Sequence, residues 1–256
     1  MTDPAPSLGL ATAGGVATLT LSRPNKRNAY NKAMLRELGE HLTRIAADDA
    51  VRVLVLRAQG RHFCAGAEIG ADDSAEPGPT IAEVCGALDT LPKPTLALVQ
   101  GACIGGGVAL VACCDVVMAA RDAVFALPEV RLGLVPGPLI PVFIAAFGPR
   151  AARRLLLSGE RFDAGEALRL GLVHEVCDAE NAEATAAHLT GELLQAAPLA
   201  AAEIKVLLRR LSGVPVTPGL LAELQAQFGA SADSAEAQEG RAAFRDKRRP
   251  RWVRDS

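Results

Sequence analysis

Three consecutive glycines, Gly105–Gly107, stand directly before an apolar run in the stretch GACIGGGVALVACCD (101–115). Glycine loses more backbone entropy on folding than any other residue, so three in a row indicate a place that needs a bare backbone. A second stretch, VLRAQGRHFCAGAEI (55–69), has the same order of a strand-like run, a turn of small residues and further apolar residues. Small residues let main-chain N–H groups approach a ligand, and a following helix adds the positive end of its dipole. Two such N–H groups converging on one carbonyl oxygen would form an oxyanion hole, which suits acyl-group chemistry.

Neither turn is specific on its own. Glycine-rich turns between a strand and a helix are common, and close packing of the two elements explains most of them. A phosphate-binding loop fits poorly, since no Lys-Ser or Lys-Thr pair follows the glycines. The elements around the turns must therefore be considered together.

Strand-like and helix-like patterns alternate along the first part of the chain. Alternation and β-branched residues predict strands over 16–21, 51–58, 95–101 and 115–120. Asn31 is expected to cap a helix with apolar residues at three- and four-residue spacing, and 106–114 fits a buried helix. This order predicts an α/β fold.

The later part of the chain becomes helical from Pro138 onward. Capping boxes are predicted at Thr80–Glu83 and at Asp163–Glu166, where a hydroxyl or carboxylate precedes a glutamate by three residues. Three or four further helices are expected over 180–247. Their apolar faces require packing against the first part of the chain or against another subunit.

Composition narrows the class of protein. The chain has 256 residues, 50% of them hydrophobic, a formal net charge of −2 and only 4% aromatic residues, which disfavours partnership with nucleic acid or an anionic membrane. Its six cysteines show no Cys-x-x-Cys pair and no histidine spacing suited to zinc, so we expect free thiols and no metal. The first residues lack the pattern of a signal peptide, and no apolar stretch reaches spanning length. We expect a cytoplasmic protein.

Taken together, four motifs resemble the crotonase, or enoyl-CoA hydratase/isomerase, superfamily. They are VATLTLSRPNKRNAYN, FCAGAEI, GACIGGGVALVACCD and LPEVRLGLVPG, followed by SGERFDAGEALRLGLVHEV and AAFRDKRRPRW near the C-terminus. The resemblance implies a crotonase-like spiral of ββα units with a helical C-terminal region. It also implies an acyl-CoA thioester as substrate, no separate cofactor, and a homotrimer that can pair into a hexamer. We expect the core at residues 1–195 and the helical trimerisation region at 196–256.

The resemblance assigns roles to individual residues. The oxyanion-hole donors would be the main-chain N–H groups of Ala67 and Gly106, and Glu129 would be the catalytic acid/base. The apolar neighbours of Glu129 are expected to raise its pKa toward neutrality, as suits a group that takes and gives a proton. The acyl end of the substrate would lie among Ala65, Gly66, Glu68, Gly105 and Ala109. Glu68 is expected to act mainly as a structural residue of the turn.

For the nucleotide end of coenzyme A, the resemblance points to the main chain near Lys26, Asn28 and Ala29. It also points to Phe244 and Lys247, often contributed by a neighbouring subunit. A lysine facing phosphates is physically reasonable, although a solvated basic tail explains the same residues.

Ala109 separates this chain from hydratases with two glutamates, which carry one of them at this position. The resemblance is greatest to bacterial methylglutaconyl-CoA hydratase-like proteins, which also lack that glutamate, and it implies hydration of a branched or carboxylated enoyl-CoA. One alternative is an enoyl-CoA isomerase that uses the same hole and the same glutamate. Another is a non-catalytic acyl-CoA-binding protein, which the retained Leu-Pro-Glu motif argues against.

Overall fold

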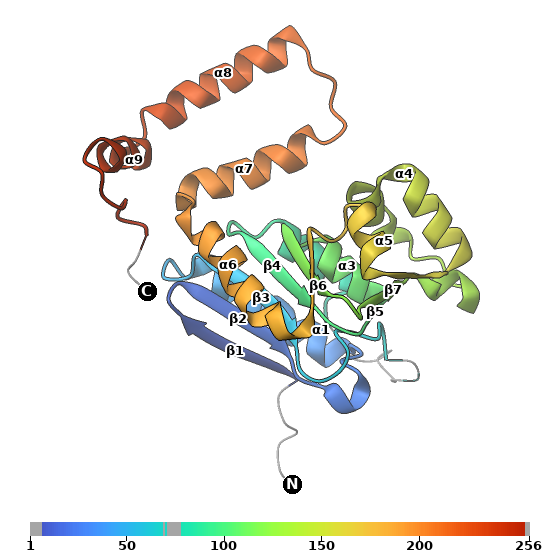
Figure 1. Cartoon of the computed structure of the whole chain (residues 1–256). Helices are drawn as coiled ribbons and strands as arrows, with labels where there is room; N and C mark the ends of the chain where they lie inside the picture. Colours follow the sequence, from blue (N-terminus) through green and yellow to red (C-terminus); the bar gives the residue numbers. More distant parts are fainter. Residues whose placement is uncertain (1–6, 69, 71–77, 254–256) are drawn as a thin grey trace.

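The main sheet forms from strands between Leu8 and Cys177, most of them rich in leucine and β-branched residues. The computed structural model describes residues 7–68, 70 and 78–253. Six strands lie in the order β1-β2-β3-β4-β6-β9, antiparallel at the β1–β2 edge and parallel elsewhere (Figure 1). Their bounds are β1 Leu8–Ala13, β2 Val16–Leu21, β3 Val53–Ala58, β4 Thr95–Val99, β6 Val116–Ala120 and β9 Glu175–Cys177. A parallel sheet requires helical crossovers, and the chain supplies them.

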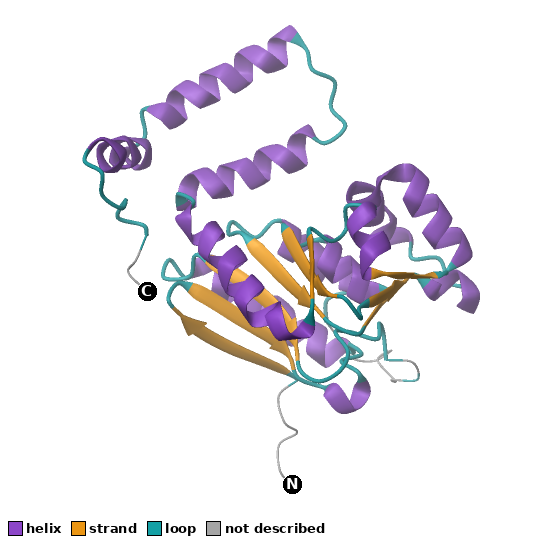
Figure 2. Cartoon of the chain, in the orientation of Figure 1, coloured by secondary structure: helices purple, strands orange, loops and turns teal. Residues whose placement is uncertain are grey.

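Both faces of this sheet are covered, because alternate side chains of a strand point to opposite faces. On β3, Leu54 and Leu56 belong to the larger core, which they share with α1, α2, α3 and α4. Val53 and Val55 belong to a smaller core under α6, which lies over the other face (Figure 2). The helices are α1 Lys32–Ala47, α2 Ile81–Asp89, α3 Gly106–Ala112, α4 Ile140–Ser158, α5 Ala164–Arg169, α6 Ala182–Gln195, α7 Pro198–Leu211, α8 Pro218–Ala232 and α9 Ala235–Arg245.

Local signals place the helix starts as the sequence predicts. The Asn31 side chain accepts a hydrogen bond from the Met34 N–H at 3.0 Å and caps α1. The predicted capping box of Thr80 and Glu83 is present in full at the start of α2. At α5 the prediction is half wrong: Asp163 caps the helix, but the Glu166 carboxylate binds arginine side chains instead of reaching back.

A small second sheet carries the glycine turn toward the site. Its strands are β5 Ala102–Ile104, β7 Val124–Ala126 and β8 Arg161–Asp163, in the order β5-β7-β8. The prediction of one strand over 95–101 that runs directly into the glycines is wrong, since β4 ends at Val99 and β5 intervenes in this second sheet. The chain changes sheets at Gly101, where φ is +56° and an added Cβ would stand 2.0 Å from the Arg61 carbonyl oxygen. Only glycine fits that crossing.

The last three helices extend away from the sheets, with α9 at the end remote from α3 and β5 (Figure 1). Neither α7 nor α8 has a buried residue in this single chain. Large apolar side chains lie exposed on all three helices, among them Leu208 at 69%, Phe228 at 68% and Phe244 at 88%. The boundary predicted near residue 195 falls at the end of α6 and stays a prediction.

The shortest strands differ from the sequence prediction. The chain is not wholly helical after Pro138, because β8 and β9 follow α4 and α5. Strands of three residues, such as β5, β7, β8 and β9, are too short to show a period of two. Strand β1 was missed because Gly9, Ala11 and Ala13 give it a small-residue composition untypical of strands.

Candidate active site

Two backbone segments lie side by side where the small-residue turns meet. Cys64 and Cys103 form a parallel bridge, in which the Ile104 N–H donates to the Cys64 carbonyl oxygen at 2.9 Å. Beyond this bridge the two segments continue to Ala67 and to Gly106, whose N–H groups are the predicted oxyanion-hole donors. In the described part of the chain, neither of these two N–H groups donates a hydrogen bond. That these two N–H groups converge on one oxygen at the start of α3 stays a prediction.

Tyr30 holds this arrangement from the other side. Its N–H donates to the Gly66 carbonyl oxygen at 2.9 Å, and its own carbonyl accepts from the Glu68 N–H at 2.8 Å. These two bonds form a bridge centred on Ala67. The segment that carries Ala67 is thus fixed between β5 and the residues before α1.

The glycine triplet is explained by what stands against each residue. A Cβ on Gly105 would lie 2.6 Å from Oε1 of Glu129, and one on Gly106 would lie 2.2 Å from the Tyr30 hydroxyl. A Cβ on Gly107 would lie 2.8 Å from the Cβ of Cys64. All three positions therefore exclude a side chain, and Gly105 also has a φ of +56°.

Glu129 lies in a short 3₁₀ helix, Pro128–Leu132, that follows β7. Phe125 and Leu127 beside it are fully buried. One carboxylate oxygen, Oε1, faces Gly105, and the other, Oε2, is buried without a hydrogen-bond partner among the described residues. Burial raises the pKa of Glu129 above its ordinary value, in the direction predicted. An unpartnered carboxylate of this kind is suited to exchanging a proton with a ligand.

The other carboxylate of the region is engaged elsewhere. Glu68 pairs with Arg23 at 2.6 Å and with Lys26 at 3.1 Å. Hydrogen bonds from these two cations hold the pKa of Glu68 below its ordinary value. This agrees with the structural role expected for Glu68, while Ala65 and Gly66 lie in the same turn before it. Ala109 is fully buried on α3, one turn after the glycines, and brings no polar group.

The residues predicted around the nucleotide of coenzyme A differ in how they are used. Asn28 is fully buried, and its side-chain amide is engaged within the chain, because it donates to the carbonyls of Gln59 and His62. The main-chain N–H and C=O of Ala29 also have partners within the chain. Of Lys26, Asn28 and Ala29, only Lys26 carries a charge, and 57% of its side chain is accessible. The structure thus leaves Lys26 as the reachable polar side chain of this group.

Phe244 and Lys247 do not join Glu129 within one chain. They lie at the end of α9 and just after it, on the side of the molecule remote from α3 and β5 (Figure 1). Their contact with coenzyme A from a neighbouring subunit stays a prediction.

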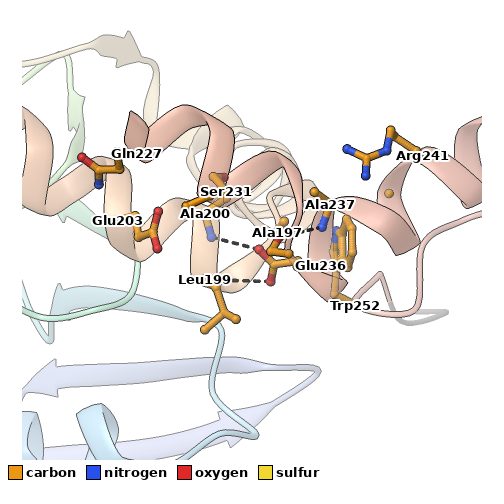
Figure 3. Close-up of a pocket in the computed structure, with 13 residues that line it drawn as sticks. Ala197, Leu199, Ala200, Glu203, Gln227, Ser231, Glu236, Ala237, Arg241 and Trp252 are labelled. Atoms are coloured by element: carbon orange, nitrogen blue, oxygen red, sulfur yellow. Dashed lines mark hydrogen bonds between the residues drawn. The ribbon is translucent and has the colours of Figure 1, made fainter. Parts of the chain in front are cut away.

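The cavity in Figure 3 is not the predicted site. It has a volume of about 500 Å³ and lies between α7, α8 and α9, with Trp252 at one side. The Glu236 carboxylate inside it accepts hydrogen bonds from the N–H groups of Leu199 and Ala200 at 3.0 and 2.9 Å, as drawn in the figure. This glutamate caps the start of α7, so the polar centre of the cavity is already satisfied.

Metal centres and membrane spans are the two other classes of site to consider. Among the residues that the structure describes, no cluster of three or more histidine, cysteine or acidic side chains has an arrangement that would hold a metal ion. Among the described helices, none combines the length and apolar character needed to cross a bilayer. All six cysteines are free and buried.

Comparison with known proteins identifies the class. The Enoyl-CoA hydratase/isomerase family model matches residues 11–255. 2,3-dehydroadipyl-CoA hydratase of Escherichia coli K12 is 35% identical over 240 residues, 92% of this chain and 94% of the relative. Carnitinyl-CoA dehydratase of Proteus mirabilis is 33% identical over 258 residues, 96% of this chain and 98% of the relative. A crystal structure of an enoyl-CoA hydratase from Shewanella pealeana matches with a TM-score of 0.90 and 35% identity, covering 96% of both chains.

The crotonase fold expected from the motifs is thereby confirmed. The chain belongs to the enoyl-CoA hydratase/isomerase family and is an enzyme of that family.

The sequence did not single out Tyr30. It is the only tyrosine of the chain, and it lies in a loop where no spacing of residues marks it. Its proximity to Gly106 depends on the bridge to Ala67, which joins segments far apart in the sequence. The one available signal was the isolated aromatic residue within the RNAYN motif.

Proposed function

We propose that this chain is an enoyl-CoA hydratase that adds water to a 2-enoyl-CoA thioester. The observation that carries the proposal is the Glu129 carboxylate, which faces the bare Gly105 with Oε2 buried and unpartnered in the described structure. The N–H groups of Ala67 and Gly106, which donate no hydrogen bond within the described structure, would hold the thioester oxygen. A raised pKa suits a group that must act first as base and then as acid.

The reaction follows from these groups. The thioester oxygen accepts hydrogen bonds from the two N–H groups. Glu129 removes a proton from water, the water oxygen bonds to C3, and the electron pair of the double bond moves onto the thioester oxygen as an enolate. C2 then takes the proton from Glu129, the carbonyl re-forms, and the net change is the addition of one water. The hole stabilises the enolate, and one such donor contributes about 3 kcal/mol to transition-state stabilisation.

The first experiment measures turnover of straight-chain, branched and carboxylated enoyl-CoA thioesters by the wild type and by Glu129→Gln, with products resolved by mass. Glutamine keeps the shape of the side chain but cannot exchange the proton. We expect the wild type to add one water, and the variant to lose about 10²- to 10⁴-fold in kcat. Equal turnover by both proteins would contradict the assignment of Glu129.

Ala109 favours one other activity. A single carboxylate is sufficient to move a proton along an acyl chain, so an enoyl-CoA isomerase would use the same groups without water. A product of unchanged mass with a shifted double bond would identify that activity. If neither protein turns over the panel while both bind acyl-CoA, the non-catalytic binding protein becomes the better description.

A substrate class can be proposed from the motifs and from one relative. We place the chain with hydratases of branched or carboxylated acyl groups, as its motifs resemble methylglutaconyl-CoA hydratase-like proteins. The relative in Escherichia coli is named for a dehydroadipyl thioester, which bears a second carboxylate. The panel therefore includes a dicarboxylic enoyl-CoA beside a branched one.

The assembly proposed is a homotrimer, which can pair into a hexamer. The exposed apolar residues of α7, α8 and α9 support it, since a single chain leaves them in water. A trimer would also bring Phe244 and Lys247 of a second copy toward the nucleotide of coenzyme A, near Lys26. The buried free cysteines fit a reducing, cytoplasmic compartment.

A further inference from the structure

The Tyr30 hydroxyl lies inside the candidate active site, although the proposed reaction uses only Glu129 and the two N–H groups. The phenolic oxygen stands 2.2 Å from the place where a Cβ on Gly106 would be. Because a Cβ lies about 2.5 Å from its own backbone nitrogen, this oxygen lies within about 5 Å of the Gly106 nitrogen. A small molecule bound to that N–H would therefore be close to the phenol.

The phenol is available to such a molecule. Among the described residues, no group forms a hydrogen bond with the Tyr30 hydroxyl. Burial raises the pKa of Tyr30, and the nearby charge of Glu129 raises it further. The phenol therefore keeps its proton at neutral pH, and it can both donate and accept a hydrogen bond.

The Tyr30 phenol lies near the region that a long side chain at position 109 of α3 would reach. Side chains of a helix tilt toward its N-terminus, so a long side chain at position 109 would extend over the turn that holds Gly105 and Gly106. Those are the glycines faced by Glu129 and Tyr30. The phenol therefore lies beside the region that a carboxylate at position 109 would reach, and alanine stands there instead.

We infer that the Tyr30 hydroxyl binds the attacking water together with Glu129, in place of a second carboxylate. This inference rests on the proposed hydration activity. Glu129 takes one proton of the water, and the phenolic oxygen accepts a hydrogen bond from the other O–H. The water oxygen then bonds to C3, while Tyr30 neither gains nor loses a proton.

The test separates water addition from proton abstraction. Hydration requires the bound water, whereas exchange of the C2 protons of saturated butyryl-CoA into D₂O requires only Glu129 and the oxyanion hole. The variant is Tyr30→Phe, which keeps the ring that packs against Gly106. We expect kcat for hydration to fall about 10- to 100-fold, the range for loss of one transition-state hydrogen bond, with KM nearly unchanged. The C2 exchange rate should remain within about threefold of the wild type.

The other outcomes overturn the inference in distinguishable ways. Equal losses in hydration and exchange would mean that Tyr30 acts through the oxyanion hole or through packing. Unchanged hydration would mean that the phenol does not bind the water. If the wild type exchanges C2 protons but hydrates no thioester, the proposed hydratase activity is wrong. The water-binding role of Tyr30 is then wrong as well.

The role of Tyr30 can also be tested without turnover, by a ¹⁹F NMR binding measurement. Since Tyr30 is the only tyrosine, growth on 3-fluorotyrosine labels this position alone and gives a single ¹⁹F resonance. In a Glu129→Gln background, we expect 3-hydroxybutyryl-CoA, whose hydroxyl occupies the place of the water, to shift this resonance more than butyryl-CoA does. Equal shifts from the two ligands would contradict the inference.

Discussion

At the scale of single residues, Glu129 combines burial, an unpartnered oxygen and apolar neighbours. Burial disfavours its charged form, so its pKa is raised in the folded protein relative to the unfolded chain. The stability associated with such a carboxyl is present at low pH and is lost as the pH rises through the folded-state pKa. Catalysis has the opposite requirement, because the base must be ionised to take a proton.

Activity and the stability contributed by Glu129 should therefore change in opposite directions as the pH rises. The acid limb of kcat/KM is expected to have a midpoint above the ordinary pKa of a glutamate. Glu129→Gln should melt at a higher temperature than the wild type at about pH 8, and the difference should shrink toward about pH 4, where the wild-type carboxyl is neutral. Calorimetric melting curves of both proteins between about pH 4 and pH 8 measure this difference in melting temperature. A difference that grows on acidification would contradict the raised pKa.

Tyr30 shows how residue chemistry depends on the elements around it. A lone tyrosine in a loop carries no periodic signal, and only the bridge to Ala67 brings it to the site. Glu129, by contrast, lies in a motif that marks it in the sequence, and the structure places it against Gly105.

At the scale of elements, the start of α3 is where the two sheets and the loop before α1 meet. Gly106→Ala would place a methyl group 2.2 Å from the Tyr30 hydroxyl, so the ring or the helix start must move. Because this displaces the predicted N–H donor, we expect kcat/KM to fall at least about 100-fold.

The matched control is Gly191→Ala. Gly191 lies within α6, and a Cβ added there meets no atom within 4 Å. Alanine in a helix interior should leave activity unchanged and raise the free energy of unfolding by about 0.5–1 kcal/mol. Activity assays and urea titration of both variants check the pair. Similar activity in the two variants would show that the approach of Tyr30 to Gly106 has no catalytic importance.

Elements with strong local patterns were predicted well and those held by tertiary contacts were not. The strand 16–21 and the helix capped by Asn31 match the structure, because alternation and capping are written in adjacent residues. Strands β5 and β7 have three residues each and owe their existence to pairing within the second sheet, β5 with β7 and β7 with β8. The glycine triplet could be recognised, but the reason for each glycine, a distant side chain standing against it, required the structure.

At the scale of the whole molecule, the uncovered helices α7, α8 and α9 predict self-association. We expect light scattering to give the mass of a trimer or a hexamer for the wild type. Leu208→Glu and Phe228→Glu, at side chains 69% and 68% exposed in the single chain, should lower that mass because they introduce charge into an apolar contact.

Leu10→Glu on β1 is the control, since Leu10 is an exposed apolar residue at 39% on another part of the surface. It should leave the mass unchanged. A monomeric wild type, or an unchanged mass in both helix variants, would exclude these helices as the interface.

The separation of α9 from β7, the strand just before Glu129, also affects how the enzyme would respond to dilution (Figure 1). In the proposed trimer, the reacting end of the thioester lies on one copy and its nucleotide meets Phe244 and Lys247 of another. Apparent affinity for a coenzyme A thioester then depends on protein concentration and weakens as the assembly dissociates. A thioester of a short thiol without the nucleotide lacks that second contact, so its weaker binding would stay constant over the same dilution series.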